Sequence, residues 1–157
     1  MFVVSKNEEI AVRDNEESDI SALMALAYHR DLEVLAMRSY CDRDGVVLLL
    51  VTNDSPRTRR VLEQVGYQCR TRPVVLVGPL ARRGWATSLQ TELESSGVHV
   101  RYSYAHRTEQ GDHYLAFKTE DDDRALRVLE VSNTLRGVMR PTDDRLAHVE
   151  ELHQIAA

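Results

Sequence analysis

The sequence contains no apolar run long enough to cross a membrane. Uninterrupted apolar runs such as Val46 to Val51 are short, whereas a membrane-spanning helix needs about 20 such residues. The N-terminus reaches a charged residue at Lys6 without the apolar core of a signal peptide. We therefore expect a cytoplasmic protein that makes no contact with a membrane.

Cysteine, glycine and proline are also scarce. The 157 residues include 2 Cys, 7 Gly and 4 Pro, and 43% are hydrophobic. Because Cys41 and Cys69 lie outside any Cys-x-x-Cys motif and form no disulfide framework, we expect both to be reduced, structural thiols. The composition excludes a collagen-like or disordered chain. The length fits one ordinary domain or two small ones of roughly 75 residues.

Positive charge is in the minority. The chain has 20 Lys and Arg against 25 Asp and Glu, which gives a net charge of -5. The basic residues form no continuous run, so we expect no nucleic-acid partner. No Gly-rich phosphate loop, Ser-His-Asp arrangement or paired-carboxylate site is present. His99, His106 and His113 recur every seven residues, but across a predicted hairpin, so we expect no metal site and no cofactor.

The sequence does contain an internal repeat. Its matching segments are Ser39-Tyr40 with Ser103-Tyr104, Gly45 with Gly111, and Arg60 to Glu63 with Arg127 to Glu130. The offset between them grows from 64 through 66 to 67. This growth places the added residues in a longer turn around Gly111, where a hairpin tolerates insertion. The repeat predicts two structural units with the same order of elements.

Local patterns predict strand, helix, strand, strand, helix, strand in each unit. In the first unit the expected elements are a strand at Ile10 to Arg13, a helix with Ile20, Leu23, Met24 and Ala27 on its apolar face, strands at Glu33 to Asp42 and Val46 to Asn53, and a helix with Ser55 as its N-cap. In the second unit they are a strand at Val74 to Val77, a helix at Trp85 to Ser95, strands at Val98 to Ala105 and His113 to Lys118, and a helix that opens at Asp121-Asp122-Asp123. The extended stretch Tyr67 to Val77, divided by Pro73, closes the first unit and opens the second.

This order predicts an α+β fold of two ferredoxin-like (βαββαβ) units with antiparallel sheets and helices on one face. We place the first unit at residues 1–72, the second at 73–140 and a helical tail at 141–157. The segment Thr134 to Arg140 fits either a closing edge strand or a linker. The apolar spacing from Arg145 to Ile155 predicts a short amphipathic helix.

The chain contains the short motifs Gly84-Trp85, Glu94-Ser95-Ser96-Gly97, the strand Val98 to Ala105, Asp122-Asp123-Arg124-Ala125, and Val65-Gly66-Tyr67 at the junction between the halves. Together these motifs resemble those of small tandem ACT-domain proteins, over roughly residues 8 to 132. In that family each unit is a ferredoxin-like ACT domain. The resemblance implies regulatory binding of an amino acid, without chemistry, at an interface between units.

The candidate ligand site is the entrance to the first helix of the second unit. A loop entering a helix leaves free backbone N–H groups beside the positive helix end, where a carboxylate can bind. Gly84 permits close approach, and Arg83 adds favourable charge. The first unit has Asp19 at the matching position, in an acidic turn that is a poor carboxylate site. The candidate ligand-binding residues are Pro79, Arg83, Gly84, Trp85 and His99.

His99 is included because of the family resemblance. It stands where the family commonly has an asparagine that holds the ligand from the neighbouring unit, and an imidazole can both donate and accept a hydrogen bond. The family also usually has an acidic residue and Pro-Gly before the helix, whereas Arg83 precedes Gly84 here. A surface or interface histidine and a plain helix-entry glycine are the alternative interpretations of His99 and Gly84.

Other functions stay open alongside regulatory amino-acid binding. A protein interaction module with a decayed ligand site is the alternative, while an enzyme is permitted by such a fold but not supported by any motif. Tyr102 and Tyr104 point to the same side of their strand, and we expect them to pack against the helices or a partner sheet. We expect a homodimer, because ACT-like sites are usually made between units and small sheets expose edges that are normally paired or covered.

Overall fold

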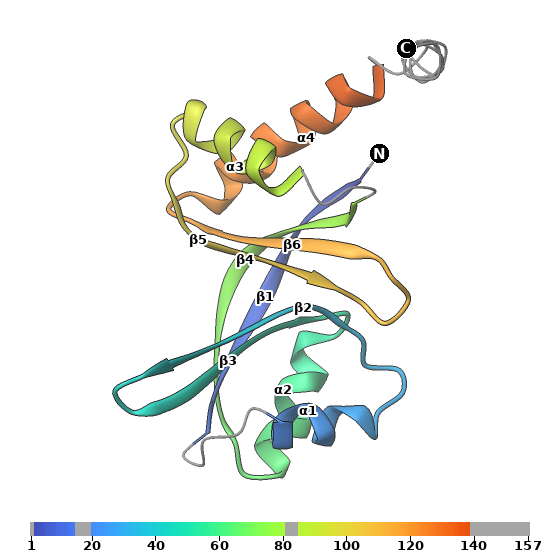
Figure 1. The fold of residues 1–157 in the computed structure, drawn as a ribbon, viewed down its shortest axis with the longest axis vertical. Coiled ribbons are helices and arrows are strands. Elements are labelled where there is room, and N and C mark those ends of the chain that lie inside the picture. The colour runs from blue at the N-terminus through green and yellow to red at the C-terminus, as the bar shows by residue number, and fades with distance from the viewer. Residues whose placement is uncertain (1, 15–19, 81–84, 139–157) are drawn as a thin grey trace, which may run out of the picture.

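The computed structural model describes residues 2–14, 20–80 and 85–138, which form one six-stranded sheet and four helices (Figure 1). The elements in chain order are β1 (Val3–Asp14), α1 (Ile20–Ala27), β2 (Val34–Asp42), β3 (Gly45–Thr52), α2 (Ser55–Gln64), β4 (Gln68–Leu80), α3 (Trp85–Ser95), β5 (Val100–Arg107), β6 (His113–Thr119) and α4 (Asp122–Val138).

Two long central strands belong to both halves of the molecule. The strand order is β2-β3-β1-β4-β6-β5, and every neighbouring pair is antiparallel. β1 pairs with β4 from Val3 opposite Gly78 to Arg13 opposite Gln68. We call β2-β3-β1-β4 with α1 and α2 the first half, and β1-β4-β6-β5 with α3 and α4 the second half. Each half has the ferredoxin-like strand order, which confirms the predicted fold class.

The second half takes its fourth strand from the N-terminus. The N-terminal part of β1 pairs with the C-terminal part of β4, so within the described residues β1 completes this half of the sheet. Thr134 to Val138 lie in α4 instead, and the predicted edge strand or linker there is wrong. The predicted division of the chain at residues 72 and 73 stays a prediction, and β4 runs through it without interruption. The predicted tail at 141–157 lies outside the described residues.

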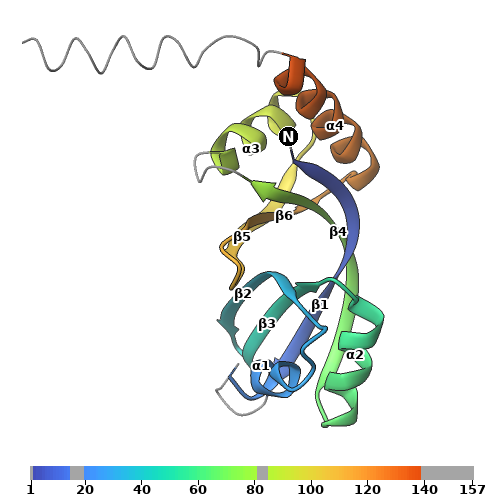
Figure 2. The same cartoon turned by 90° about the vertical axis from the view of Figure 1, so that its right-hand side faces the viewer.

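The two sheet halves face each other, with a helix pair on each outer side (Figures 1 and 2). This arrangement creates three apolar clusters. Leu89, Leu93 and Phe117 are in the cluster beneath α3 and α4, and Ile10, Leu50 and Leu62 are in the cluster beneath α1 and α2. Ala36, Leu49, Val74, Leu76, Tyr104 and Ala116 are in the cluster between the sheet halves. The predicted packing of Tyr102 and Tyr104 is confirmed, because both contact this middle cluster.

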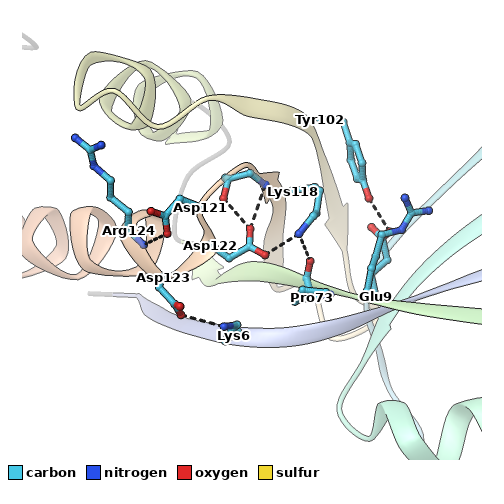
Figure 3. Close-up of polar contacts among 11 residues, drawn as sticks. Lys6, Glu9, Pro73, Tyr102, Lys118, Asp121, Asp122, Asp123 and Arg124 are labelled. Atoms are coloured by element: carbon cyan, nitrogen blue, oxygen red, sulfur yellow. Dashed lines mark hydrogen bonds and ion pairs between the residues drawn. The ribbon is translucent and has the colours of Figure 1, made fainter.

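A buried carboxylate lies beside Tyr102 and Tyr104, between the sheet halves (Figure 3). Glu9 of β1 is 0% exposed. Its Oε1 accepts from the Tyr102 hydroxyl at 2.8 Å and lies 3.0 Å from Arg72 Nε in an ion pair, while its Oε2 accepts from the Tyr104 hydroxyl at 2.8 Å. Burial and the Glu9 charge raise the pKa of both tyrosines, so their hydroxyls stay protonated as donors. Glu9 therefore fixes β5 against the central strands.

Further polar contacts fix β1 to the second half. Lys6 Nζ lies 2.9 Å from Asp123 Oδ1 at the start of α4, and the Phe2 backbone N donates to Asn133 Oδ1 at 3.2 Å (Figure 3 shows the Lys6 contact). The predicted acidic start of α4 is also confirmed, because Asp121 Oδ1 accepts from the Arg124 backbone N at 2.9 Å.

Local details of the first half differ from expectation. The N-cap of α2 is Asp54, whose side chain accepts from the Arg57 backbone N, whereas the Ser55 hydroxyl donates to the Glu8 carbonyl at 2.9 Å. Ser55 is thus used to attach α2 to β1. On α1 the residues that face the core are Ala22, Leu23 and Leu26, while Met24 is 58% exposed. Cys41 and Cys69 are free thiols, as predicted.

Candidate functional site

The predicted ligand residues lie at two separate places, and two of them cannot be placed. Arg83 and Gly84 are outside the described residues. Pro79 is exposed near the end of β4, and Trp85 begins α3. The Trp85 ring meets Phe2 edge to face, with ring centroids 5.2 Å apart. The Arg136 guanidinium lies over the Trp85 ring, 5.2 Å from its centroid. The Trp85 side chain therefore packs α3 against α4 and β1.

His99 lies at the opposite end of the second half. It is exposed just before β5, where its carbonyl accepts from the Glu120 backbone N at 3.1 Å. Leu80, in contrast, pairs with His113, at the other end of β6. With a rise of about 3.3 Å per residue, the strand register separates Pro79 from the level of His99 by roughly 20 Å. A site that combines Pro79 with His99 thus requires His99 from a second copy of the chain.

A cavity of about 350 Å³ lies where β4 ends and α3 begins. Leu80 and Ala86 line it, and they lie on either side of residues 81–84 in the sequence. Its polar lining residues are His106, Arg107, His113 and Tyr114. They meet because β5 and β6 are paired in a register that sets His106 opposite Tyr114 and Arg107 opposite His113. The helix entrance of the second half therefore adjoins a cavity of the size used by small-molecule sites.

Among the described lining residues, the cavity has one permanent cation, Arg107, beside His106 and Tyr114. Burial lowers the pKa of His106, which favours the neutral imidazole. Burial, followed by the charges of Asp112 and Glu33, raises the pKa of Tyr114 and keeps its hydroxyl protonated. Arg107 supplies the positive charge. The arrangement can pair with one carboxylate and donate or accept hydrogen bonds to an uncharged group.

Gly78 of β4 is in close contact with Tyr114, one of the residues that line the cavity. A Cβ built on Gly78 would lie 2.3 Å from Tyr114 Cδ1, so the ring rests directly on the strand backbone. The sequence analysis assigned the close-approach role to Gly84 and did not single out Gly78. An isolated glycine within an apolar strand, here Val74 to Leu80, is a signal of such close approach and could have identified it.

Two of the three evenly spaced histidines line this cavity. His106 and His113 both line it, whereas His99 lies at the far end of the sheet. Within residues 2–14, 20–80 and 85–138, no group of three or more His, Cys, Asp or Glu side chains is arranged to hold a metal ion. His106, Arg107, His113 and Tyr114 were not predicted as site residues, although the predicted hairpin would have placed them across from one another. In the same described part of the chain, no helix has the length and apolar character needed to span a membrane.

Comparisons with known proteins identify the fold. No protein-family model and no curated protein matches the chain. Among solved structures, protein BT0572 from Bacteroides thetaiotaomicron matches with a TM-score of 0.64 and 16% identity, over 83% of this chain and 89% of that chain. The ligand-free regulatory subunit of aspartate kinase from Thermus thermophilus matches with a TM-score of 0.55 and 16% identity, over 83% and 95%. The corresponding subunit from Thermus flavus matches with a TM-score of 0.50 and 15% identity, over 82% and 94%. The chain therefore shares the fold of these proteins, with ferredoxin-like ACT-type units.

Proposed function

We propose that this protein is a non-enzymatic regulatory protein that binds an amino acid at an interface between ACT-like units. The observation that carries the proposal is the cavity beside the entrance to α3, with Arg107 at its polar side. Its place supports the sequence-based assignment of this loop as the ligand site. The likeness of the fold to regulatory subunits of aspartate kinase supports a regulatory role.

The proposed ligand contacts follow from the chemistry of an amino acid. Backbone N–H groups of Gly84 and Trp85 hold the carboxylate, and Arg83 adds positive charge. Pro79 borders the loop, and His99 of a second copy provides a donor or acceptor for the ligand. Arg107 is the cation nearest to this arrangement among the described cavity residues, and it forms a further charge-assisted contact with the carboxylate.

The proposed assembly is a homodimer. β2 and β5 end the sheet, so each has one edge without a strand partner in the described part of the chain. Such edges are normally paired or covered. The separation between Pro79 and His99 in one chain also favours a site completed by a second copy. Light scattering over a wide concentration range should give the mass of a dimer, and a strict monomer would contradict this assembly.

A thermal-shift screen against the amino acids tests the proposed ligand class. A ligand present at 100 times its dissociation constant should stabilise the protein by about 2.7 kcal/mol. Calorimetry with the ligand found should then show weakened binding for Gly84→Val, because the added side chain occupies the carboxylate position. Asp19→Val, the matched change in the first half, should bind as the parent does. The reverse result would move the site to the first half.

If no amino acid bound in either the thermal-shift screen or calorimetry, the proposed function would be rejected. It would favour the alternative, a protein interaction module whose ligand site has decayed.

A further inference from the structure

The first half has a cavity of its own on the sheet face turned away from α1 and α2. Its volume is about 530 Å³, larger than that of the cavity in the second half. Ala11 and Val47 contribute apolar surface, and Tyr40 contributes a phenol ring. Three of its lining residues are arginines, Arg13, Arg70 and Arg72. A cavity rich in guanidinium groups is unexpected in a chain with a net charge of -5.

The register of the two central strands brings these arginines to one face. Arg13 of β1 lies opposite Gln68, while Arg70 and Arg72 of β4 lie opposite Ala11 and Glu9. Alternate residues of a strand point to the same face, and directly or diagonally opposed residues are within reach of long side chains. Because Ala11 is small, it leaves the space between the arginines open. Like charges so close together destabilise a sheet unless anions compensate them.

The protein compensates these arginines unequally. Arg13 donates from both terminal nitrogens to Asp42, at 2.7 and 2.6 Å. Arg72 Nε lies 3.0 Å from Glu9 Oε1, and the guanidinium lies over the Tyr102 ring, 5.8 Å from its centroid, but its terminal nitrogens donate no hydrogen bond to the described residues. Arg70 is exposed and likewise has no side-chain partner in residues 2–14, 20–80 and 85–138. Asp44 is the acid among the lining residues. Donors of Arg70 and Arg72 therefore remain available.

We propose that this cavity is a second ligand site, which binds a small molecule carrying a phosphate or carboxylate group. The planar guanidinium matches either oxyanion with two parallel hydrogen bonds, and such charge-assisted bonds are stronger than neutral ones. Arg70 and the terminal nitrogens of Arg72 hold the anion, and Tyr40 borders the rest of the molecule. The cavity volume lies within the range of about 300–1,000 Å³ typical of small-molecule sites. This site is separate from the proposed amino-acid site and does not depend on it.

Calorimetry on the full-length protein tests the site, with pyrophosphate and succinate as probes at low ionic strength. At least one probe should bind saturably, and Arg70→Ala should weaken its binding by about tenfold, the loss expected for one charged hydrogen bond. Arg70→Glu should weaken it further. Because Arg70 is exposed and unpaired in the described part of the chain, these variants should keep the parent's unfolding temperature within a few degrees.

The matched control is Arg101→Ala, which removes another exposed strand arginine without a described side-chain partner. It should bind the probe as the parent does. Equal weakening by Arg70→Ala and Arg101→Ala would indicate nonspecific charge attraction and overturn the site, as would the absence of saturable binding of both probes. Binding of pyrophosphate alone identifies a phosphate ligand, and binding of succinate alone identifies a dicarboxylate.

Gly84→Val separates this proposal from the proposed function. It should leave probe binding unchanged even if it abolishes binding of an amino acid, and Arg70→Ala should leave amino-acid binding unchanged. Loss of probe binding in Gly84→Val would overturn the assignment to the first half.

Discussion

The two halves share one order of strands and helices, but they differ where the long central strands end. In the first half, Arg13 lies opposite Val47 and is paired with Asp42. In the second half, Gly78 carries no side chain and the Tyr114 ring rests on its backbone. The first half therefore has an open, charged cavity, and the second has a smaller one with an aromatic and imidazole lining. The strand order determines where a cavity forms, whereas the side chains near the strand ends determine its chemistry.

The largest effect is expected from breaking the contact that both halves share. Glu9→Ala leaves the hydroxyls of Tyr104 and Tyr102 without their acceptor and Arg72 without its ion-pair partner. Removing one partner from a buried charged network costs about 3–5 kcal/mol. We expect the free energy of unfolding in urea to fall by that amount. The control Glu8→Ala truncates an exposed neighbouring carboxylate and should change it by less than about 0.5 kcal/mol. Equal losses in both variants would show that Glu9 has no special role.

An intermediate effect is expected from giving Gly78 a side chain. Gly78→Ala forces the Tyr114 ring to move, and overpacking of this kind costs about 1–3 kcal/mol. Tyr114→Val places in the second half the residue type that the first half has at Val47. In that background Gly78→Ala should cost much less, because the ring is gone. A double-mutant cycle by urea denaturation measures this coupling, and simple additivity would contradict the close contact.

The smallest effect is expected from acid, and it should affect the two halves in different pH ranges. The Arg13 hydrogen bonds lower the pKa of Asp42 from 3.8 to about 2. Stability from this pair is thus present above pH 3.8 and lost as the pH falls towards 2. Burial lowers the pKa of His106 from 6.5, so its contribution is present above pH 6.5 and lost as the pH falls through its lowered pKa.

Nuclear magnetic resonance titration of both side chains checks this order. The His106 ring should titrate below pH 6.5 and the Asp42 carboxyl near pH 2. Arg13→Ala should return the Asp42 midpoint towards 3.8 and leave His106 unchanged. An Asp42 midpoint that does not respond to Arg13→Ala would show that the ion pair is absent in solution.

Most of the fold was predictable because its signals are local. The Val46 to Val51 run, the Pro56 after the cap of α2 and the turn glycines Gly45 and Gly111 each act within a few residues. The positive φ angles of Gly45 and Gly111 match the predicted hairpins, and the turn of 108–112 is longer than that of 43–44, as the growing offset indicated.

The pairing of the residues before Ile10 with β4 could not be predicted from such local signals. Residues before Ile10 include Lys6, Asn7, Glu8 and Glu9, a polar run that indicates a loop. They form a strand because β4 supplies the hydrogen bonds and the two tyrosines of β5 supply donors for Glu9. Such long-range compensation leaves no mark in the local pattern.

The candidate sites were predictable only in part, for the same reason. The helix entrance beside Trp85 follows from a turn and a glycine, and a cavity adjoins it. The arginine cavity instead depends on the register between β1 and β4. A shift of one residue would move Arg70 to the opposite face. The sequence alone does not specify which of the many possible registers these strands adopt.

The shared strand β1 also sets an order of events during synthesis. Val3 pairs with Gly78, so the first strand of the chain to be made waits for a partner 75 residues later. Pairings of such long sequence separation slow folding, because loop closure must precede the gain from contacts. Until β4 has left the ribosome, residues 3–8 present an unsatisfied strand to whatever lies nearby. Residues 3–8 are therefore exposed to chaperone capture or mispairing during synthesis, and completion of β4 ends that exposure for both halves in a single step.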